Sequence, residues 1–345
     1  MAPRINIPPL TRFLLITCIA LTISNAIIRP YTDLQAPLTR IGVGAPYLSI
    51  VPGQSIIYPW VFFTATLVEQ NIFGLIISGL TLFYGGRYLE RAWGSAEFGK
   101  FILVTTLIPN LLTFGTLVSL FVLSRHDGFL TATISGALPL QASFLVSLKQ
   151  LVPEHTVSLF RSLIRIRVKH FPAIFLLVNT IAAIVLGTYT ALLLSWYGFF
   201  TSWIYLRFFR VSPSTLEGQE TTVKGDASDT FAFPFFFPEP IHTPLAAICD
   251  RIYEALVAMR VCTPFSAADI ESGNAQASAR SEGGLPSIMN PRGGRGWAGE
   301  TECYWRKRTG TTTSSSSCCS RAILIKSGTS GSCWTIGIGR NPVRT

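Results

Sequence analysis

Six long apolar stretches fill the first two-thirds of this 345-residue chain and restrict what it can fold into. They lie at 13–28, 72–84, 101–123, 129–148, 171–186 and 189–206. Several approach or exceed the roughly 20 residues that carry a helix across a bilayer core. Only 13% of the residues are charged, whereas soluble domains contain about a quarter. The sequence therefore predicts an all-α, polytopic membrane protein whose first partner is the lipid bilayer.

The loops between these stretches differ in their content of basic residues. A six-span arrangement gathers most cations on one side of the membrane, namely Arg4, Arg12, Arg87, Arg91, Lys100, Lys149, Arg161, Arg165, Arg167, Lys169, Arg207 and Arg210. Only Arg29, Arg40 and Arg125 fall on the other side. Because Lys and Arg accumulate in cytoplasmic loops, we predict that both termini are cytosolic and that loops 30–58 and 124–128 are luminal or external.

The net charge of +10 has a simpler origin than nucleic-acid binding. The basic residues flank apolar spans in short loops, so membrane orientation and anionic lipid account for them, and we expect no nucleic-acid partner. The first apolar stretch lacks a small-x-small cleavage site and is expected to be a retained anchor helix. The seven cysteines are scattered, and none is predicted to be luminal. We therefore expect no disulfide framework, no metal site and no cofactor.

The chain divides into four parts by composition. Residues 1–210 form the predicted transmembrane domain, and 211–230 read as a polar linker rich in turn-forming residues. Within 231–265, an aromatic segment precedes an amphipathic helix at 243–262, whose apolar residues have helical spacing. Residues 266–345 are predicted to be a disordered tail. From about 297 onward the pattern is uninterpretable, and a genuine tail and a gene-model error both remain open.

The aromatic segment at 231–238 contains five phenylalanines and two prolines in eight residues. Such a segment cannot form a helix, so we expect it to run extended. It could pack on the protein's own surface or dock a partner, and both readings stay open. The candidate partner-binding residues are therefore Phe231, Phe233, Phe235, Phe236 and Phe237.

A glycine-flanked motif lies between the second and third predicted spans. It has the form Gly-x-x-Leu-Glu-x-x-x-Gly-Ser and contains Gly86, Leu89, Glu90, Trp93 and Gly94. The glycines let the chain leave one helix and enter the next, while the glutamate can accept hydrogen bonds from free backbone N–H groups. This motif resembles the loop after the second core helix of rhomboid intramembrane proteases.

A second match to rhomboids lies in the fourth stretch. The sequence around Ser135 and Gly136 resembles that of the helix that bears the rhomboid nucleophile. With segments 60–71, 148–154, 202–208 and 231–238, the chain is similar over about 1–290 to the transmembrane protein 115 family. That resemblance implies a rhomboid-like six-helix bundle in Golgi membranes, non-proteolytic and active in Golgi-to-ER retrograde transport. It also implies transmembrane cargo and cytosolic trafficking or tethering proteins as partners, and it is compatible with a homo-oligomer.

Catalysis would require a serine activated by a histidine, together with donors for the oxyanion. The last stretch, where the partner histidine belongs, contains none, and rhomboid spacing puts Gly74 and Ser78 where His and Asn are expected. His126 alone is predicted to be luminal and would reach Ser135 only if its loop folded back. We therefore predict a pseudoprotease in which Ser135 closes a helix contact.

Two alternatives from other functional classes remain. An active rhomboid-type protease would use Ser135, and a small-molecule transporter would use Glu69 or Asn179. The sequence otherwise predicts hydrated positions for Glu69 to Asn71 in a luminal loop. It predicts interhelical hydrogen bonds for Asn110, Gln141 and Asn179, and a kink at Pro139.

Overall fold

The computed structural model describes residues 7–35, 45–152, 156–159, 164–214, 221–237, 239–259 and 266–282. These residues belong to one compact unit, Met1–Pro286. The sequence from 283 onward, including the uninterpreted stretch from 297, lies outside the described residues. The described chain is predominantly helical and carries several helices long and apolar enough to cross a bilayer, so the prediction of an all-α polytopic membrane protein is confirmed.

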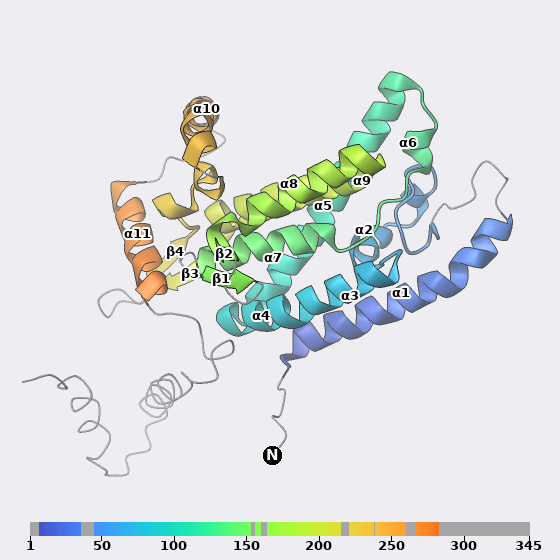
Figure 1. The fold of residues 1–345 in the computed structure, drawn as a ribbon, viewed down its shortest axis with the longest axis horizontal. Coiled ribbons are helices and arrows are strands. Elements are labelled where there is room, and N and C mark those ends of the chain that lie inside the picture. Colours follow the sequence, from blue (N-terminus) through green and yellow to red (C-terminus); the bar gives the residue numbers. More distant parts are fainter. Residues whose placement is uncertain are drawn as a thin grey trace, which may run out of the picture. The chain divides into compact units, whose positions relative to one another are not determined.

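The long helices run side by side as a bundle (Figure 1). They are α1 (Pro9–Gln35), α3 (Ile72–Thr81), α4 (Arg87–Trp93), α5 (Ser95–Ser124), α7 (Leu138–Leu151), α8 (Phe171–Leu186) and α9 (Tyr189–Ile204). A π-helical turn, Leu82–Gly86, joins α3 to α4, and a second one, Tyr205–Phe209, follows α9. The short helices α2 (Val61–Thr64) and α6 (Gly128–Thr131) lie at one end of the bundle.

Within the described parts of the chain, four stretches are long and apolar enough to span a membrane: Pro9–Arg29, Ile72–Trp93, Ser95–Ser124 and Val168–Leu186. The two remaining predicted spans correspond to α7 and α9, which have 14 and 16 residues. These two helices pack closely, because a Cβ atom at Gly198 of α9 would lie 2.5 Å from the Pro139 Cα atom of α7. That all six cross the bilayer stays a prediction.

The bundle is apolar both inside and outside. Phe98, Phe101 and Phe199 are fully buried, whereas Phe73 of α3 is 76% exposed. Other exposed apolar residues on the same helix are Ile72, Ile76, Ile77 and Leu80. An outward apolar face of this size is expected of a helix that contacts lipid.

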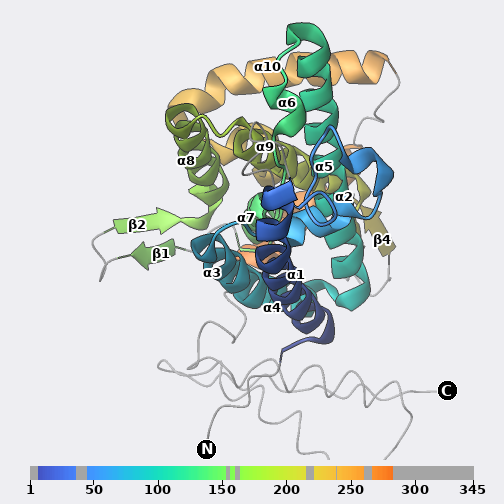
Figure 2. The ribbon, with the colours of Figure 1, turned by 90° about the vertical axis from the view of Figure 1, so that its right-hand side faces the viewer.

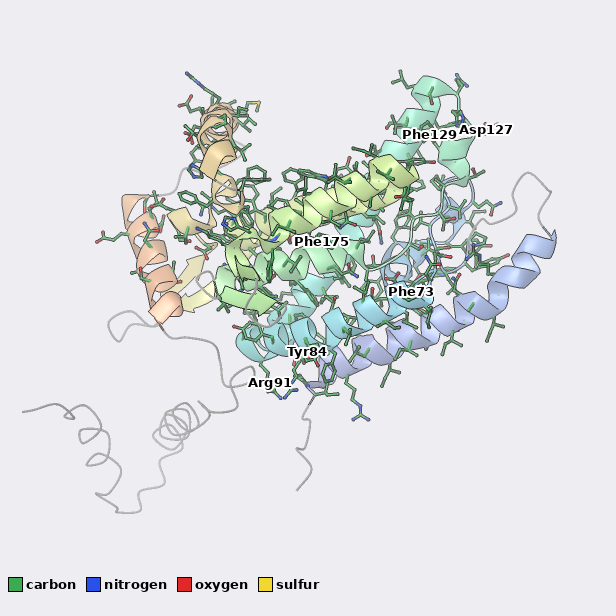
Figure 3. The ribbon with its side chains drawn as sticks, in the orientation of Figure 1. Phe73, Tyr84, Arg91, Asp127, Phe129 and Phe175 are labelled. Carbon is green, nitrogen blue, oxygen red and sulfur yellow. The ribbon has the colours of Figure 1, made fainter. Side chains whose placement is uncertain are left out.

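Figure 3 distinguishes the two ends of the bundle. Tyr84 and Arg91 lie at the end occupied by α4, whereas Asp127 and Phe129 lie at the opposite end. The end that holds α4 is the one predicted to be cytosolic.

Two short antiparallel hairpins extend the fold beyond the helices. β1 (Thr156–Leu159) pairs with β2 (Ile164–Arg167), and β3 (Val211–Ser214) pairs with β4 (Thr221–Lys224). The second hairpin lies within 211–230, the stretch predicted to be a polar linker, so part of that stretch is a strand pair. In β2 the sequence Ile-Arg-Ile-Arg alternates with the two-residue period of a strand, a signal present in the sequence but read there as a basic loop.

The segment after the second hairpin also differs from prediction. Two 3₁₀ turns, Asp229–Phe231 and Phe233–Phe236, replace the expected extended run, although Ala232 and Phe237 are extended. The predicted amphipathic helix exists as α10 (Glu239–Ala258).

Disorder was predicted from 266, but residues 267–282 form a helix, α11 (Ala267–Glu282). A capping box starts it: the Asp269 N–H donates to Ser266 Oγ at 3.1 Å, and the Ser266 N–H donates to the Asp269 carboxylate at 3.1 Å. Asn274 Oδ1 also accepts a bond from the Asp229 N–H at 2.9 Å. The polar composition hid these local and tertiary partners.

The predicted orientation can be tested with glycosylation acceptors. An Asn-x-Thr sequence placed within 124–128 should gain an N-glycan in a eukaryotic host, while one placed within 160–163 should not, because only the luminal face meets the transferase. A mobility shift removed by endoglycosidase reports the modification. Glycans at 160–163 and none at 124–128 would reverse the orientation.

Candidate functional site

An extended segment interrupts the bundle between α6 and α7. Helix α6 ends at Thr131, and the next helix starts only at Leu138. Within the gap, Ile134 exchanges two backbone hydrogen bonds with Ile50, at 2.8 and 3.1 Å. The Gly136 N–H donates to the Ala65 carbonyl at 3.0 Å. Non-helical backbone can lie inside a membrane protein only where protein or water satisfies it, and here other segments of the chain do so.

This interruption corrects the predicted continuous fourth span. Ser135 precedes helix α7 instead of lying six residues inside a helix. Pro139 falls in the first turn of α7, where its missing N–H is not needed, so it starts the helix and does not kink it. Gly136 has a φ of +104°, a conformation that favours glycine. Both residues therefore mark the boundary of a helix.

The carboxylate of Glu69 lies at the start of α7. Its Oε1 atom accepts hydrogen bonds from the Ala137 N–H at 2.8 Å and from Ser78 Oγ at 2.6 Å. The Glu69 N–H in turn donates to Thr22 Oγ1 at 3.2 Å. A helix N-terminus presents free N–H groups and favours a negative charge. Glu69 is thus a structural anion that joins α1, α3 and α7, and not merely a residue of a hydrated loop, as predicted.

The partner of Ser135 is an amide. Gln70 Nε2 donates to Ser135 Oγ at 3.0 Å, and Arg29 Nη1 donates to Gln70 Oε1 at 3.3 Å. An amide nitrogen carries two hydrogens and has no basic lone pair, so it cannot remove the serine proton. Gln70 thus contacts the Ser135 hydroxyl as a hydrogen-bond donor, where a serine protease would have a general base.

The described histidines are placed elsewhere. His126 is exposed, and its Nδ1 atom accepts a bond from the Gly128 N–H at 3.2 Å. His170 directly precedes α8, and His242 of α10 contacts the Phe235 ring at 4.5 Å. His155 lies outside the described residues. Within the described part of the chain, the hydrogen bond that reaches the Ser135 hydroxyl comes from Gln70.

Gly74 and Ser78 occupy the positions where a rhomboid protease is expected to carry His and Asn. Both face the Glu69 carboxylate. A Cβ atom at Gly74 would lie 2.7 Å from Glu69 Oε2, and Ser78 Oγ is 2.6 Å from Oε1. The Glu69 carboxylate therefore lies beside both positions, and the Ser78 hydroxyl already donates to it.

Other polar groups join helices, with one exception. Asn110 Nδ2 donates to the Phe62 carbonyl at 2.7 Å and to Thr66 Oγ1 at 2.8 Å, and Gln141 Nε2 donates to Ser78 Oγ at 3.1 Å. These are the contacts expected between elements in a membrane. Asn179 differs from prediction, because it donates to the Phe175 carbonyl of its own helix at 2.9 Å.

Glu90 of the glycine-flanked motif receives four hydrogen bonds. The Leu10 and Thr11 N–H groups donate at 3.0 and 2.7 Å, Thr11 Oγ1 donates at 2.7 Å, and Ser95 Oγ donates at 2.6 Å. The side chain therefore caps the start of α1 and binds it to the beginning of α5. Glu90 is only 3% exposed.

The remaining motif residues fit around this cap. A Cβ atom at Gly86 would lie 3.2 Å from the Thr11 Cγ2 atom, and Gly94 turns into α5 with a φ of +84°. Leu89 is fully buried. The Trp93 ring packs edge-on against Phe101 at 5.2 Å and lies under the Arg210 guanidinium at 4.1 Å. The motif is thus a joint between three helices.

A second polar cluster fixes the segment 226–237 on the bundle. Gln150 Nε2 donates to the Asp226 carboxylate at 2.8 Å, and Arg210 Nη1 donates to Gln150 Oε1 at 3.1 Å. Arg207 Nη1 donates to the carbonyls of Asp226 and Ser228, at 2.7 and 2.6 Å. Asp226 and Ser228 come from the stretch 211–230, which was predicted to be a polar linker, whereas the side chains that bind them come from α7 and the end of α9.

The phenylalanines of the aromatic segment mostly pack inward. Phe231 and Phe236 are buried, Phe233 and Phe237 are half-buried, and Phe235 is 44% exposed. The ring of Phe233 stacks on Phe200 of α9 at 5.7 Å. Of the two readings left open by the sequence, the structure favours packing on the protein's own surface. As a partner-binding residue, only Phe235 is accessible among the five.

Comparison with known proteins places this fold in a family. The family model described as "Eukaryotic integral membrane protein (DUF1751)" matches residues 12–296. The chain belongs to this family of eukaryotic integral membrane proteins. The motif, the interrupted segment before α7 and the aromatic segment all lie within the matched range.

Individual relatives agree with this membership. The chain is 32% identical to Rhomboid-like protein 19 of Arabidopsis thaliana over 60% of its length and 66% of the relative's. It is 31% identical to the Transmembrane protein 115 homolog of Saccharomyces cerevisiae, over 82% of the chain and 88% of the relative. It is 28% identical to human Transmembrane protein 115, over 65% of the chain and 62% of the relative. The chain thus spans slightly less than two-thirds of the plant and human relatives. The predicted resemblance to the transmembrane protein 115 family is confirmed.

The Glu90 cap predicts a stability loss. Glu90→Ala leaves two backbone N–H groups of α1 without their acceptor and removes two hydroxyl contacts, so we expect a loss of about 3 kcal/mol. The unfolding midpoint of the purified protein in nanodiscs measures it. Glu97→Ala is the matched control, since Glu97 pairs only with the exposed Lys100 nearby. Equal midpoints for both variants would contradict the cap.

For Lys149 we predict the opposite effect on stability, namely a gain when its charge is removed. Its side chain lies in α7 and is only 3% exposed, so the ammonium is shielded from water. Its Nζ lies 3.3 Å from the Phe236 ring centroid and has no hydrogen-bond partner among the described residues. The cation–π contact contributes about 1–2 kcal/mol, whereas burying an ammonium costs several.

Lys149→Met should therefore raise the unfolding midpoint, because the thioether fills the same space without a charge. Lys100→Met, at an exposed position, should leave the midpoint unchanged. A lower midpoint for Lys149→Met would show that the contact with Phe236 outweighs the cost of burial.

Proposed function

We propose that this protein is a non-catalytic, rhomboid-like protein of Golgi membranes that acts in vesicle trafficking, in retrograde transport from the Golgi to the ER. It does so by binding transmembrane cargo within the bilayer and trafficking or tethering proteins in the cytosol. The observation that carries the non-catalytic part is the pairing of Ser135 with the Gln70 amide, beside a Glu69 carboxylate that holds the start of α7.

The chemistry of this site supports recognition better than hydrolysis. A serine protease needs a base that removes the hydroxyl proton and donors that stabilise the oxyanion. Gln70 donates to the hydroxyl oxygen, and Glu69 already accepts the Ala137 N–H and the Ser78 hydroxyl hydrogen. The alternative of a transporter is not favoured by Asn179, which bonds to its own helix.

The outer surface of α3 supports cargo binding within the membrane. Ile72, Phe73, Ile76 and Ile77 are more than half exposed, and Gly79 has open space where a Cβ atom would be. Small residues on an apolar face allow another helix to approach closely. A transmembrane segment could therefore pack along α3 without displacing the polar core behind it.

The Golgi location and the direction of transport rest on family membership and on the resemblance to the transmembrane protein 115 family. The aromatic segment adds Phe235 as an accessible anchor for a cytosolic partner.

A rescue experiment separates recognition from catalysis. In cells that lack the protein and return Golgi-resident membrane proteins to the ER slowly, expression of the wild-type chain should restore the rate. Ser135→Ala should restore it equally, because the hydroxyl has no chemical task, and the rescuing chain should co-localise with a Golgi marker. If Ser135→Ala is as abundant as the wild-type chain but does not restore the rate, the proposal is contradicted. It is also contradicted if the rescuing chain lies in a compartment other than the Golgi.

The cytosolic part of the proposal needs a truncation that preserves the bundle. A chain cut after Arg210 would lose Asp226 and Phe236, which pack on α7, so its failure would be uninformative. A chain ending at Phe237 keeps these contacts. Under the proposal it folds and reaches the Golgi, and Phe235→Ser within the full chain weakens rescue more than Ile184→Ala does, since Ile184 of α8 is exposed but lies outside the proposed binding surfaces. Full rescue by Phe235→Ser would show that Phe235 is not needed to bind the cytosolic partner.

A further inference from the structure

Helix α10 lies across the direction of the bundle helices. Figure 1 shows α10 end-on while α8 and α9 run lengthwise, and in Figure 2, turned by 90°, α10 runs lengthwise. It contacts the 3₁₀ turn Phe233–Phe236, which packs on α9 through Phe199 and Phe200. Helix α10 therefore lies at the end of the bundle where α9 finishes, with its axis along the plane of a membrane that the bundle crosses.

One face of α10 is apolar and uncovered. Ile248, Ile252 and Met259 are 56%, 54% and 65% exposed, and Ala255 is also exposed. Their spacing of four, three and four residues aligns them in one stripe along the helix. Asp250 and Glu254 lie away from the stripe, whereas Arg251 borders it, and all three charged residues are exposed.

Exposed apolar residues of the bundle occur at the same end. Ile204 and Phe209, at the finish of α9 and its π-helical turn, are 42% and 58% exposed, and Phe235 beside α10 is 44% exposed. Apolar side chains are thus exposed at the end of the bundle that α10 contacts, and the stripe on α10 adds to them.

We propose that α10 is an interfacial helix whose stripe of Ile248, Ile252, Ala255 and Met259 is embedded in the headgroup and acyl boundary of the adjacent leaflet. Helices with one apolar and one charged face lie in the membrane plane in this way. Charges of both signs flank the stripe, with Arg251 Nη1 only 3.6 Å from Glu254 Oε2, so apolar burial and not attraction to anionic lipid is the driving force. A second copy of the chain is the competing occupant, because the same spacing also suits a paired helix.

Site-specific photocrosslinking in the intact chain tests this proposal. A benzophenone amino acid is introduced at Ile252, with Glu254 as the matched control two residues away on the charged face. Both side chains are exposed, so neither replacement disturbs the core. The purified full-length variants are reconstituted into phosphatidylcholine vesicles, irradiated and analysed by intact mass.

We expect lipid adducts at position 252 and none at position 254. Replacing part of the phosphatidylcholine with phosphatidylserine should leave the yield at 252 unchanged. Three results overturn the proposal: a crosslinked dimer at 252 in place of lipid adducts, equal lipid adducts at both positions, or adducts at neither position. Crosslinking at Phe73 of α3, which faces outward from the bundle, confirms that the vesicles report lipid contact.

Discussion

Backbone polar groups inside a membrane protein must find partners within the protein, and this requirement shapes the region before α7. The chain there is extended, and it is satisfied by Ile50, by Ala65 and by the Glu69 carboxylate. Because these partners come from the segment before α3, the interruption fixes how the segment 45–71, α3 and α7 fit together. The carboxylate is thus part of the architecture, and it could not be removed without leaving an N–H and a hydroxyl group unpaired.

The same constraint supports the proposal that this rhomboid-like chain is non-catalytic. A small residue at 74 leaves room for the Glu69 side chain, and the Ser78 hydroxyl donates to it at 2.6 Å. With the Glu69 carboxylate in this space, the Ala137 N–H at the start of α7 already has its hydrogen-bond acceptor. Ser135 then serves as an acceptor for Gln70. At the other end of the bundle, the buried carboxylate of Glu90 caps α1 by the same means, so two carboxylates stabilise two helix starts.

The sequence was most informative where one physical signal dominates. Long apolar stretches predicted the membrane helices, and the glycine-flanked motif pointed to Glu90 as an acceptor of backbone N–H groups. Prediction failed where partners are distant in sequence. Apolarity alone could not show that 132–137 is non-helical, because its hydrogen-bond partners Ile50 and Ala65 lie far away in sequence. Asp226 was read as part of a polar linker for the same reason, since its partner Gln150 is distant in sequence. The helix at 267–282 was hidden by polar composition, although Ser266 and Asp269 form a readable capping box.

The most direct measurement is the reaction of the purified protein in nanodiscs with a fluorophosphonate probe, read as intact mass and mapped by peptide sequencing. A serine that receives a hydrogen bond from Gln70 should form no adduct, in the wild-type chain or in Ser135→Ala. An adduct on Ser135 in the wild-type chain, absent from Ser135→Ala, would show an activated nucleophile and contradict the account.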